Sequence, residues 1–114
     1  MPAKDSMKRL QDELQNLGRF SEPALLILIS LADGPKHGYA MTQDIEAVSG
    51  QNLGPGTLYG AITRLEGREW IAPLPSEERR RPYRLTDAGR RVLRHRLEAM
   101  KAMMKVGSRR LADA

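Results

Sequence analysis

The chain has 114 residues, and its 19 Lys and Arg outnumber its 14 Asp and Glu to give a formal net charge of +5. This length suits a single domain, residues 1–114, and the basic balance favours anionic partners, nucleic acid first and a membrane surface second. The absence of cysteine excludes disulfides and thiolate metal sites. The first residues lack the apolar region of a signal peptide, and the longest apolar stretch is too short for a bilayer. We therefore expect a cytoplasmic protein with no membrane partner.

The sequence predicts a first helix over residues 5–18. Asp5 or Ser6 can cap its start, and Gly18 is well placed to end it. Apolar residues recur along it at spacings of three and four, which is typical of a helix with one apolar face. We expect this face to pack against another element. It holds Met7, Leu10, Leu14 and Leu17.

Residues 23–85 are predicted to form a head that contains a helix-turn-helix. Pro23 suits the first turn of a helix, and the run after it is apolar on every side, so periodicity alone leaves a buried helix or a buried strand open there. Two short amphipathic helices follow, one from Gly38 to near Gly50 and one from Pro55. A buried helix before two such helices is the helix-turn-helix pattern. Their buried faces hold Met41, Ile45 and Val48, and then Leu58, Ala61, Ile62 and Leu65.

Two short strands are predicted next, over residues 70–74 and 81–85, with a polar tip between them. Their prolines suggest an edge ribbon, and such a ribbon beside a helix-turn-helix is a wing. Thr86 and Asp87 can cap a final helix of about 40 Å that reaches Leu111. The predicted fold class is mainly α with a small β-hairpin wing, a winged helix-turn-helix with N- and C-terminal dimerisation helices over residues 5–18 and 86–111.

Four short motifs, in the same order, carry a resemblance to a known family. Over residues 23–94 the chain resembles the PadR-like family of winged-helix transcriptional regulators. The resemblance implies a dimeric repressor that responds to a small molecule. Two positions depart from the family pattern, since Gly54 stands where Ser is frequent and Gly60 where Pro is usual. The motifs are Gly34-Pro35-Lys36-His37-Gly38-Tyr39, Gly54-Pro55-Gly56-Thr57-Leu58-Tyr59, Arg64-Leu65-Glu66 and Arg80-Arg81-Pro82-Tyr83-Arg84-Leu85-Thr86-Asp87-Ala88-Gly89.

The helix that begins at Pro55 is expected to enter the major groove of DNA. On its outward side Arg64 could pair bidentately with guanine, and Thr63 could contact a thymine methyl group. The glycines on that side either allow a close approach to DNA or are merely tolerated, at a cost of up to about 1 kcal/mol each. This outward side holds Gly56, Thr57, Tyr59, Gly60, Thr63, Arg64 and Gly67.

Positive charge is densest at the tip of the predicted wing. It either contacts phosphate or a minor groove, or forms a solvated turn balanced by Glu77 and Glu78. Lys36 is a further candidate for phosphate contact, and the hydroxyls of Tyr59 and Tyr83 lie beside the same surface. The predicted DNA-binding residues are Lys36, Thr57, Tyr59, Thr63, Arg64, Arg79, Arg80, Arg81 and Tyr83.

The final helix carries an apolar stripe that is longer than the small head can cover. Such a stripe is unusual on a soluble monomer, so we expect it to form a homodimer interface. Its methionines could instead line a pocket between subunits for a small apolar or aromatic effector. The predicted interface residues are Leu10, Leu14, Leu93, Leu97, Met100, Met104 and Leu111. The possible effector-binding residues are Leu97, Met100, Met103 and Met104.

Neither a metal site nor an enzyme is predicted. His37 and His95 are far apart with no carboxylate cluster at ligand spacing, and no nucleophile motif is present. The predicted function is that of a sequence-specific transcriptional regulator, a repressor that leaves a palindromic operator in double-stranded DNA when an effector binds. The alternatives are an architectural DNA-binding protein without sequence preference, and a winged-helix module that binds another protein. No cofactor is expected.

Overall fold

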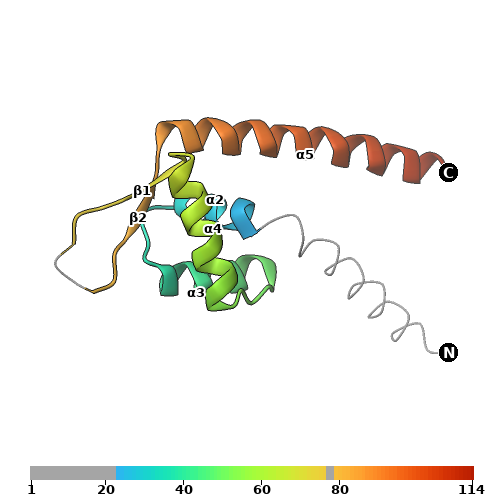
Figure 1. The fold of residues 1–114 in the computed structure, drawn as a ribbon. Coiled ribbons are helices and arrows are strands. Elements are labelled where there is room, and N and C mark those ends of the chain that lie inside the picture. The colour runs from blue at the N-terminus through green and yellow to red at the C-terminus, as the bar shows by residue number, and fades with distance from the viewer. Residues whose placement is uncertain (1–22, 77–78) are drawn as a thin grey trace, which may run out of the picture.

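The computed structural model describes residues 23–76 and 79–114. The described part is mainly helical with one two-stranded antiparallel hairpin, which confirms the predicted mainly α class with a small β-hairpin wing (Figure 1). The helix predicted over residues 5–18 lies outside the described residues. The elements are α2 (Pro23–Ala32), α3 (Gly38–Ser49), α4 (Pro55–Gly67), β1 (Ile71–Pro73), β2 (Tyr83–Leu85) and α5 (Asp87–Asp113).

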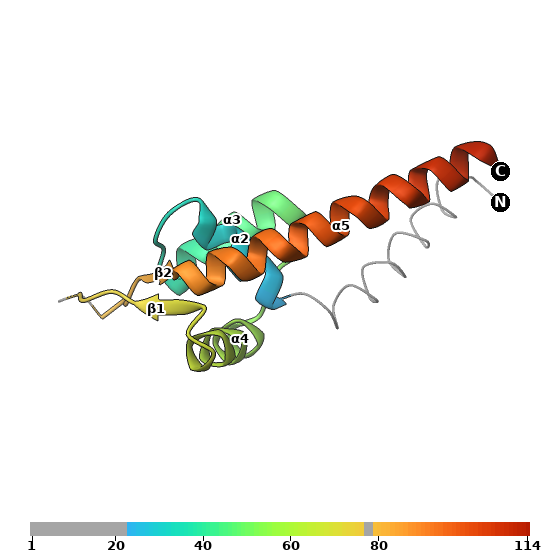
Figure 2. The same cartoon turned by 90° about the horizontal axis from the view of Figure 1, so that it is seen from above.

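Helix α2 lies at the centre of the hydrophobic core. The apolar run after Pro23 forms a helix and not a strand. Because α3, α4, β2 and the start of α5 all pack against it, this helix needs apolar side chains on several faces (Figure 2). Its buried apolar residues are Leu25, Ile27, Leu28 and Leu31.

The two amphipathic helices bury most of the side chains that their periodicity predicts. All four expected residues of α4, Leu58, Ala61, Ile62 and Leu65, are buried. In α3, Met41 and Ile45 are buried, but Val48, predicted with them, is 63% exposed. Val48 lies in the last turn of α3, just before the left-handed Gly50 cap, where the helix has left the core.

The hairpin is shorter than predicted. Ile71 pairs with Leu85 and Pro73 with Tyr83, and one further bond joins the Leu74 amide to the Pro82 carbonyl at 2.8 Å. Pro73 at the end of β1 and Pro82 just before β2 lack the N–H that a longer ladder needs, which limits the pairing. A backbone bridge that the sequence did not indicate joins Tyr83 to Lys36: each amide donates to the other residue's carbonyl, at 3.0 and 3.1 Å. The hairpin is therefore tied to the segment that leads into α3.

The start of α5 is fixed by a cap and by a close backbone contact. As predicted, Thr86 is the N-cap: its Oγ1 accepts from the Gly89 amide at 3.0 Å and donates to the Glu69 carbonyl at 2.7 Å. A Cβ atom at Gly89 would lie 2.0 Å from the backbone oxygen of Trp70. Only glycine therefore lets the start of α5 lie this close to the backbone of Trp70, the residue just before β1.

We expect Gly89→Ala to lower the free energy of unfolding by about 1–3 kcal/mol, the usual cost of overpacking, because a backbone oxygen has to move. Gly60→Ala is the matched control, since Gly60 lies inside α4 with open space around a Cβ. There alanine should raise stability by up to about 1 kcal/mol through its helix propensity. Urea unfolding of both variants measures the difference. A Gly89→Ala chain as stable as the original would contradict the tight fit proposed for the α5 start.

Towards its C-terminal end α5 leaves the head. Its 27 residues extend for about 40 Å, and its C-terminal half lies past every other described element (Figure 1). Gly89 and Leu93 are its buried residues. Leu93, predicted for the dimer interface, is only 5% exposed because it belongs to the core of its own chain, so we leave it out of the interface proposed below. No helix in the described ranges has the length and apolar character that crossing a membrane requires.

Candidate nucleic-acid interface

The outward side of α4 is open. The predicted groove-facing residues Thr57, Tyr59, Thr63 and Arg64 are all exposed on it, opposite the buried face. The Thr63 hydroxyl donates to the Tyr59 carbonyl of its own helix at 2.9 Å, which leaves its methyl group as the part suited to a thymine methyl. Arg64 forms no ion pair with any described residue, so its guanidinium group is available for a guanine.

The remaining positions on the outward side of α4 are glycines, which leave the helix backbone without side-chain cover there. Gly56, Gly60 and Gly67 are exposed, and a Cβ built on any of them would meet nothing within 4 Å. Nothing in the described chain therefore requires glycine at these positions, and the α4 backbone is accessible to a partner. The N-cap residue of α4 is Gly54, which has no side chain to accept a hydrogen bond from the first amides of the helix.

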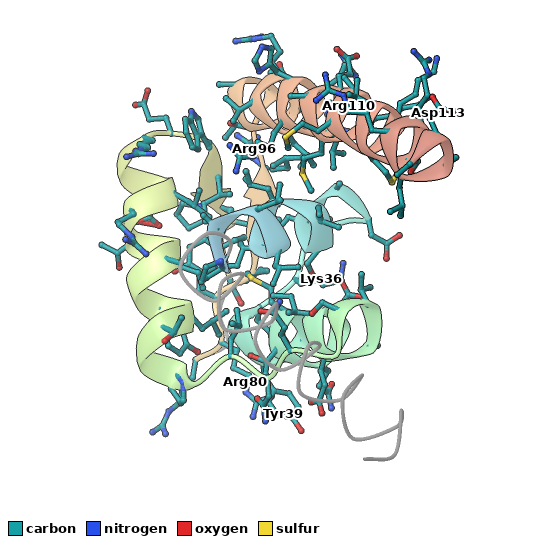
Figure 3. All side chains as sticks on the ribbon, turned by 90° about the vertical axis from the view of Figure 1, so that its right-hand side faces the viewer. Lys36, Tyr39, Arg80, Arg96, Arg110 and Asp113 are labelled. Carbon is teal, nitrogen blue, oxygen red and sulfur yellow. The ribbon has the colours of Figure 1, made fainter. Side chains whose placement is uncertain are left out.

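The wing tip is exposed at one end of the molecule (Figure 1). Arg79, Arg80 and Arg81 all reach solvent there. The guanidinium group of Arg80 lies 5.3 Å above the ring centre of Tyr39, a residue of α3 (Figure 3). The ring of Tyr39 therefore lies against the wing. The glutamates that could balance the charge of the tip lie outside the described residues.

Lys36 is held inside the head. Its Nζ donates to the carbonyls of Ser30 and Gly34 and lies 3.7 Å from the carboxylate of Asp33. Only 17% of its side chain is exposed. These partners gather at the C-terminal end of α2, where the helix dipole favours a cation. Because its charge is already bound there, we do not assign Lys36 to the DNA interface.

The other tyrosines differ in how far they reach the surface. Tyr83 is partly buried against the core. Burial, followed by the negative charge of Glu66, raises the pKa of Tyr83 above its usual value of 10.0. Tyr59 is about half exposed, and its hydroxyl covers the start of α3, where a Cβ at Gly38 would lie 2.8 Å from it. Gly38 is therefore needed for Tyr59 to pack in this place.

His37, which the sequence pattern led us to consider only as a metal ligand, is the N-cap of α3. Its Nδ1 accepts from the Ala40 amide at 3.3 Å, and its ring stacks on that of Tyr39 with 6.5 Å between centres. Histidine is not among the preferred cap residues, so sequence preference gave no signal of this role. No group of three or more potential metal ligands occurs among the described residues.

The distal part of α5 presents the predicted apolar stripe to solvent. The exposed fraction rises from 41% at Leu97 to 79% at Leu111. Of the predicted effector residues, Leu97 alone lines a groove of about 300 Å³ between α5 and the head, while Met100, Met103 and Met104 do not line it. Leu10 and Leu14 lie outside the described residues. The groove is lined by Ala32, Leu85, Leu93 and Leu97, with Arg90, Arg94, Glu98 and Lys101.

A buried helix, a helix-turn-helix with an open third helix and a basic wing together define the winged-helix class. The model of the transcriptional regulator PadR-like family matches residues 27–95, well over half of the chain. The chain belongs to this family.

The chain is similar to one sequence relative and to two solved structures of this family. An uncharacterized 37.1 kDa protein in a transposon of Streptomyces fradiae is 49% identical over 82 residues, which make up 72% of this chain and 24% of the relative. The chain thus spans about a quarter of that relative's length. A PadR family regulator from Eggerthella lenta superposes with a TM-score of 0.69 at 27% identity, over 98% of this chain and 99% of that one. A PadR family regulator from Clostridium difficile superposes with a TM-score of 0.71 at 26% identity, over 78% and 97%.

Proposed function

We propose that the chain is a sequence-specific DNA-binding repressor that binds a palindromic operator as a homodimer. The open outward side of α4, beside the exposed arginines of the wing, is the observation that carries the proposal. Arg64 and Thr63 contact base edges in the major groove. Arg79, Arg80 and Arg81 contact phosphates or the adjacent minor groove.

The exposed stripe of α5 supports the dimer. In this proposal a second copy of the chain covers the stripe, and each covered side chain contributes up to about 1.5–3 kcal/mol. A two-fold pairing presents two copies of α4 to successive major grooves, roughly 34–36 Å apart. The proposed interface residues are Leu97, Met100, Met104 and Leu111, with Leu10 and Leu14.

The groove beside α5 supports regulation by a small molecule. Half of its lining residues are apolar, and among the charged ones Arg90, Arg94 and Lys101 outnumber Glu98. This lining suits an apolar or aromatic molecule with an anionic group. Binding there would release DNA by changing the spacing of the two heads. Titrating a series of aromatic acids against the protein–DNA complex tests this idea, and the absence of both DNA release and thermal stabilisation would count against it.

Arg64→Ala tests the proposed base reading. We expect operator affinity to fall by about 1–3 kcal/mol, roughly 5- to 150-fold, and the preference at one base pair of each half-site to relax. Arg109→Ala, an equal loss of charge near the far end of α5, should leave that preference unchanged. Titration of the operator and of variants at each base pair measures both effects. An equal loss on every sequence would make Arg64 a phosphate contact.

A second function has one observation in its favour. The outward side of α4 carries three glycines and few side chains that can read bases, which also suits an architectural protein without sequence preference. The affinity ratio between operator and random DNA separates the two. A specific regulator should give a ratio on the order of 10³ or more, and an architectural protein a ratio close to 1.

A further inference from the structure

The wing is attached to the helix-turn-helix at two separate places. At its base, the backbone of Tyr83 pairs with that of Lys36, just before α3. Nearer its tip, Arg80 lies over the ring of Tyr39 in the first turn of α3 (Figure 3). Between these two attachments, cross-strand pairing reaches only to Leu74 and Pro82. The Arg80–Tyr39 contact therefore links the tip side of the wing to α3.

The ring of Tyr39 is itself held by α3. The Tyr39 hydroxyl accepts a hydrogen bond from Gln43 Nε2 at 3.3 Å, one turn further along the helix. On the other side in sequence, the ring of the cap residue His37 stacks on it at an interplanar angle of 16°. These two neighbours give the ring a defined place although it is 57% exposed. Arg80 thus packs against an aromatic ring whose position is set by other residues of α3 and its cap.

We propose that Tyr39 positions the wing for DNA through Arg80, without contacting DNA itself. This inference rests on the proposed function, in that the wing arginines must touch DNA. A guanidinium group on an aromatic face keeps its N–H donors in its own plane, so Arg80 can lie on Tyr39 and still donate to a phosphate. Without the ring, this long side chain has to be ordered when DNA binds, which weakens the complex.

A double-mutant cycle with the full chain tests the proposal. Affinity and its salt dependence are measured for a short duplex of random sequence, since phosphate contacts act on any DNA. Tyr39→Leu should weaken binding about two- to five-fold, the effect expected for removing an exposed cation–π pair. Its salt slope should stay unchanged, because the variant keeps every cation. Tyr39→Phe keeps the ring face and should bind like the original chain, although it lacks the bond from Gln43.

The second arm combines the substitutions. In an Arg80→Ala background, Tyr39→Leu should cause no further loss of affinity, because the side chain through which it acts is gone. A loss as large as in the original background would overturn the proposal, since Tyr39 would then act on DNA or on the head without Arg80. If Arg80→Ala itself changed neither affinity nor salt slope, the proposed phosphate contact would fail together with this inference. Failure of the inference alone leaves the Arg80→Ala effect in place.

Discussion

A chain with Leu97→Glu is expected to be a monomer at micromolar concentration while its head keeps its fold. Leu97 is 41% exposed in the single chain, so a carboxylate there can reach water. In the proposed dimer the same carboxylate would lie in an apolar seam without a partner, where burial is costly. In a dimer, once one head has bound its half-site, the second head is held close to the other half-site. A monomer loses this advantage, so operator affinity should fall by about 10²- to 10⁴-fold.

Sedimentation equilibrium and an operator titration measure the two effects of Leu97→Glu. Ala102→Glu is the matched control, because Ala102 is exposed on the same helix but lies about 140° around it from Leu97. This control should stay dimeric and bind normally. If the Leu97→Glu chain also stayed dimeric and bound normally, the interface would lie elsewhere, with the predicted face of Leu10 and Leu14 as the next candidate.

Replacing the three wing arginines, Arg79, Arg80 and Arg81, by alanine should weaken binding to operator and random DNA alike. Phosphate contacts release condensed counterions, so the slope of log K against log salt should fall by about 1 for each phosphate that is no longer bound, or about 3 per head. All three side chains reach solvent at the tip. Because a smaller salt slope separates the two affinities most at low salt, the loss of affinity should be largest there. A salt series on both DNAs gives the slope.

The control for the wing removes the same charge elsewhere. Lys105, Arg109 and Arg110 lie towards the end of α5, and replacing all three by alanine changes the net charge equally. Their removal should leave the slope nearly unchanged, because the C-terminal end of α5 is far from the wing (Figure 1 shows the two on opposite sides of the molecule). An unchanged slope in the wing variant would remove the wing from the interface.

Local patterns in the sequence predicted most of the head correctly. The four buried residues of α4 follow from a helical period, and the Thr86 cap follows from a residue preference, so neither depends on distant parts of the chain. Val48 continues the same period beyond the point where α3 meets a neighbour, and it is exposed. Periodicity identifies a face of a helix, but tertiary packing decides how far along that face burial extends.

The sequence predicted the surroundings of some residues less accurately, because those surroundings depend on contacts between distant segments of the chain. Leu93 lies on the predicted stripe of α5, but the pattern does not say whether the chain's own head or a partner covers it. Lys36 meets the end of α2 only once that helix is folded. The contact between Tyr39 and Arg80 joins two segments that are 41 positions apart, and neither residue carries a local signal of it. The groove beside α5 likewise combines residues of α2, β2 and α5.

The central claim, a two-headed protein that reads DNA sequence, is tested most directly by the protection and stoichiometry of the native chain on the DNA beside its own gene. We expect two chains per site and two protected half-sites whose centres lie about 10–10.5 base pairs apart, or a multiple of that distance. Random DNA of equal length should fail to compete at equal concentration. Uniform coverage without a preferred site, or one chain per site with a single protected segment, would contradict the claim.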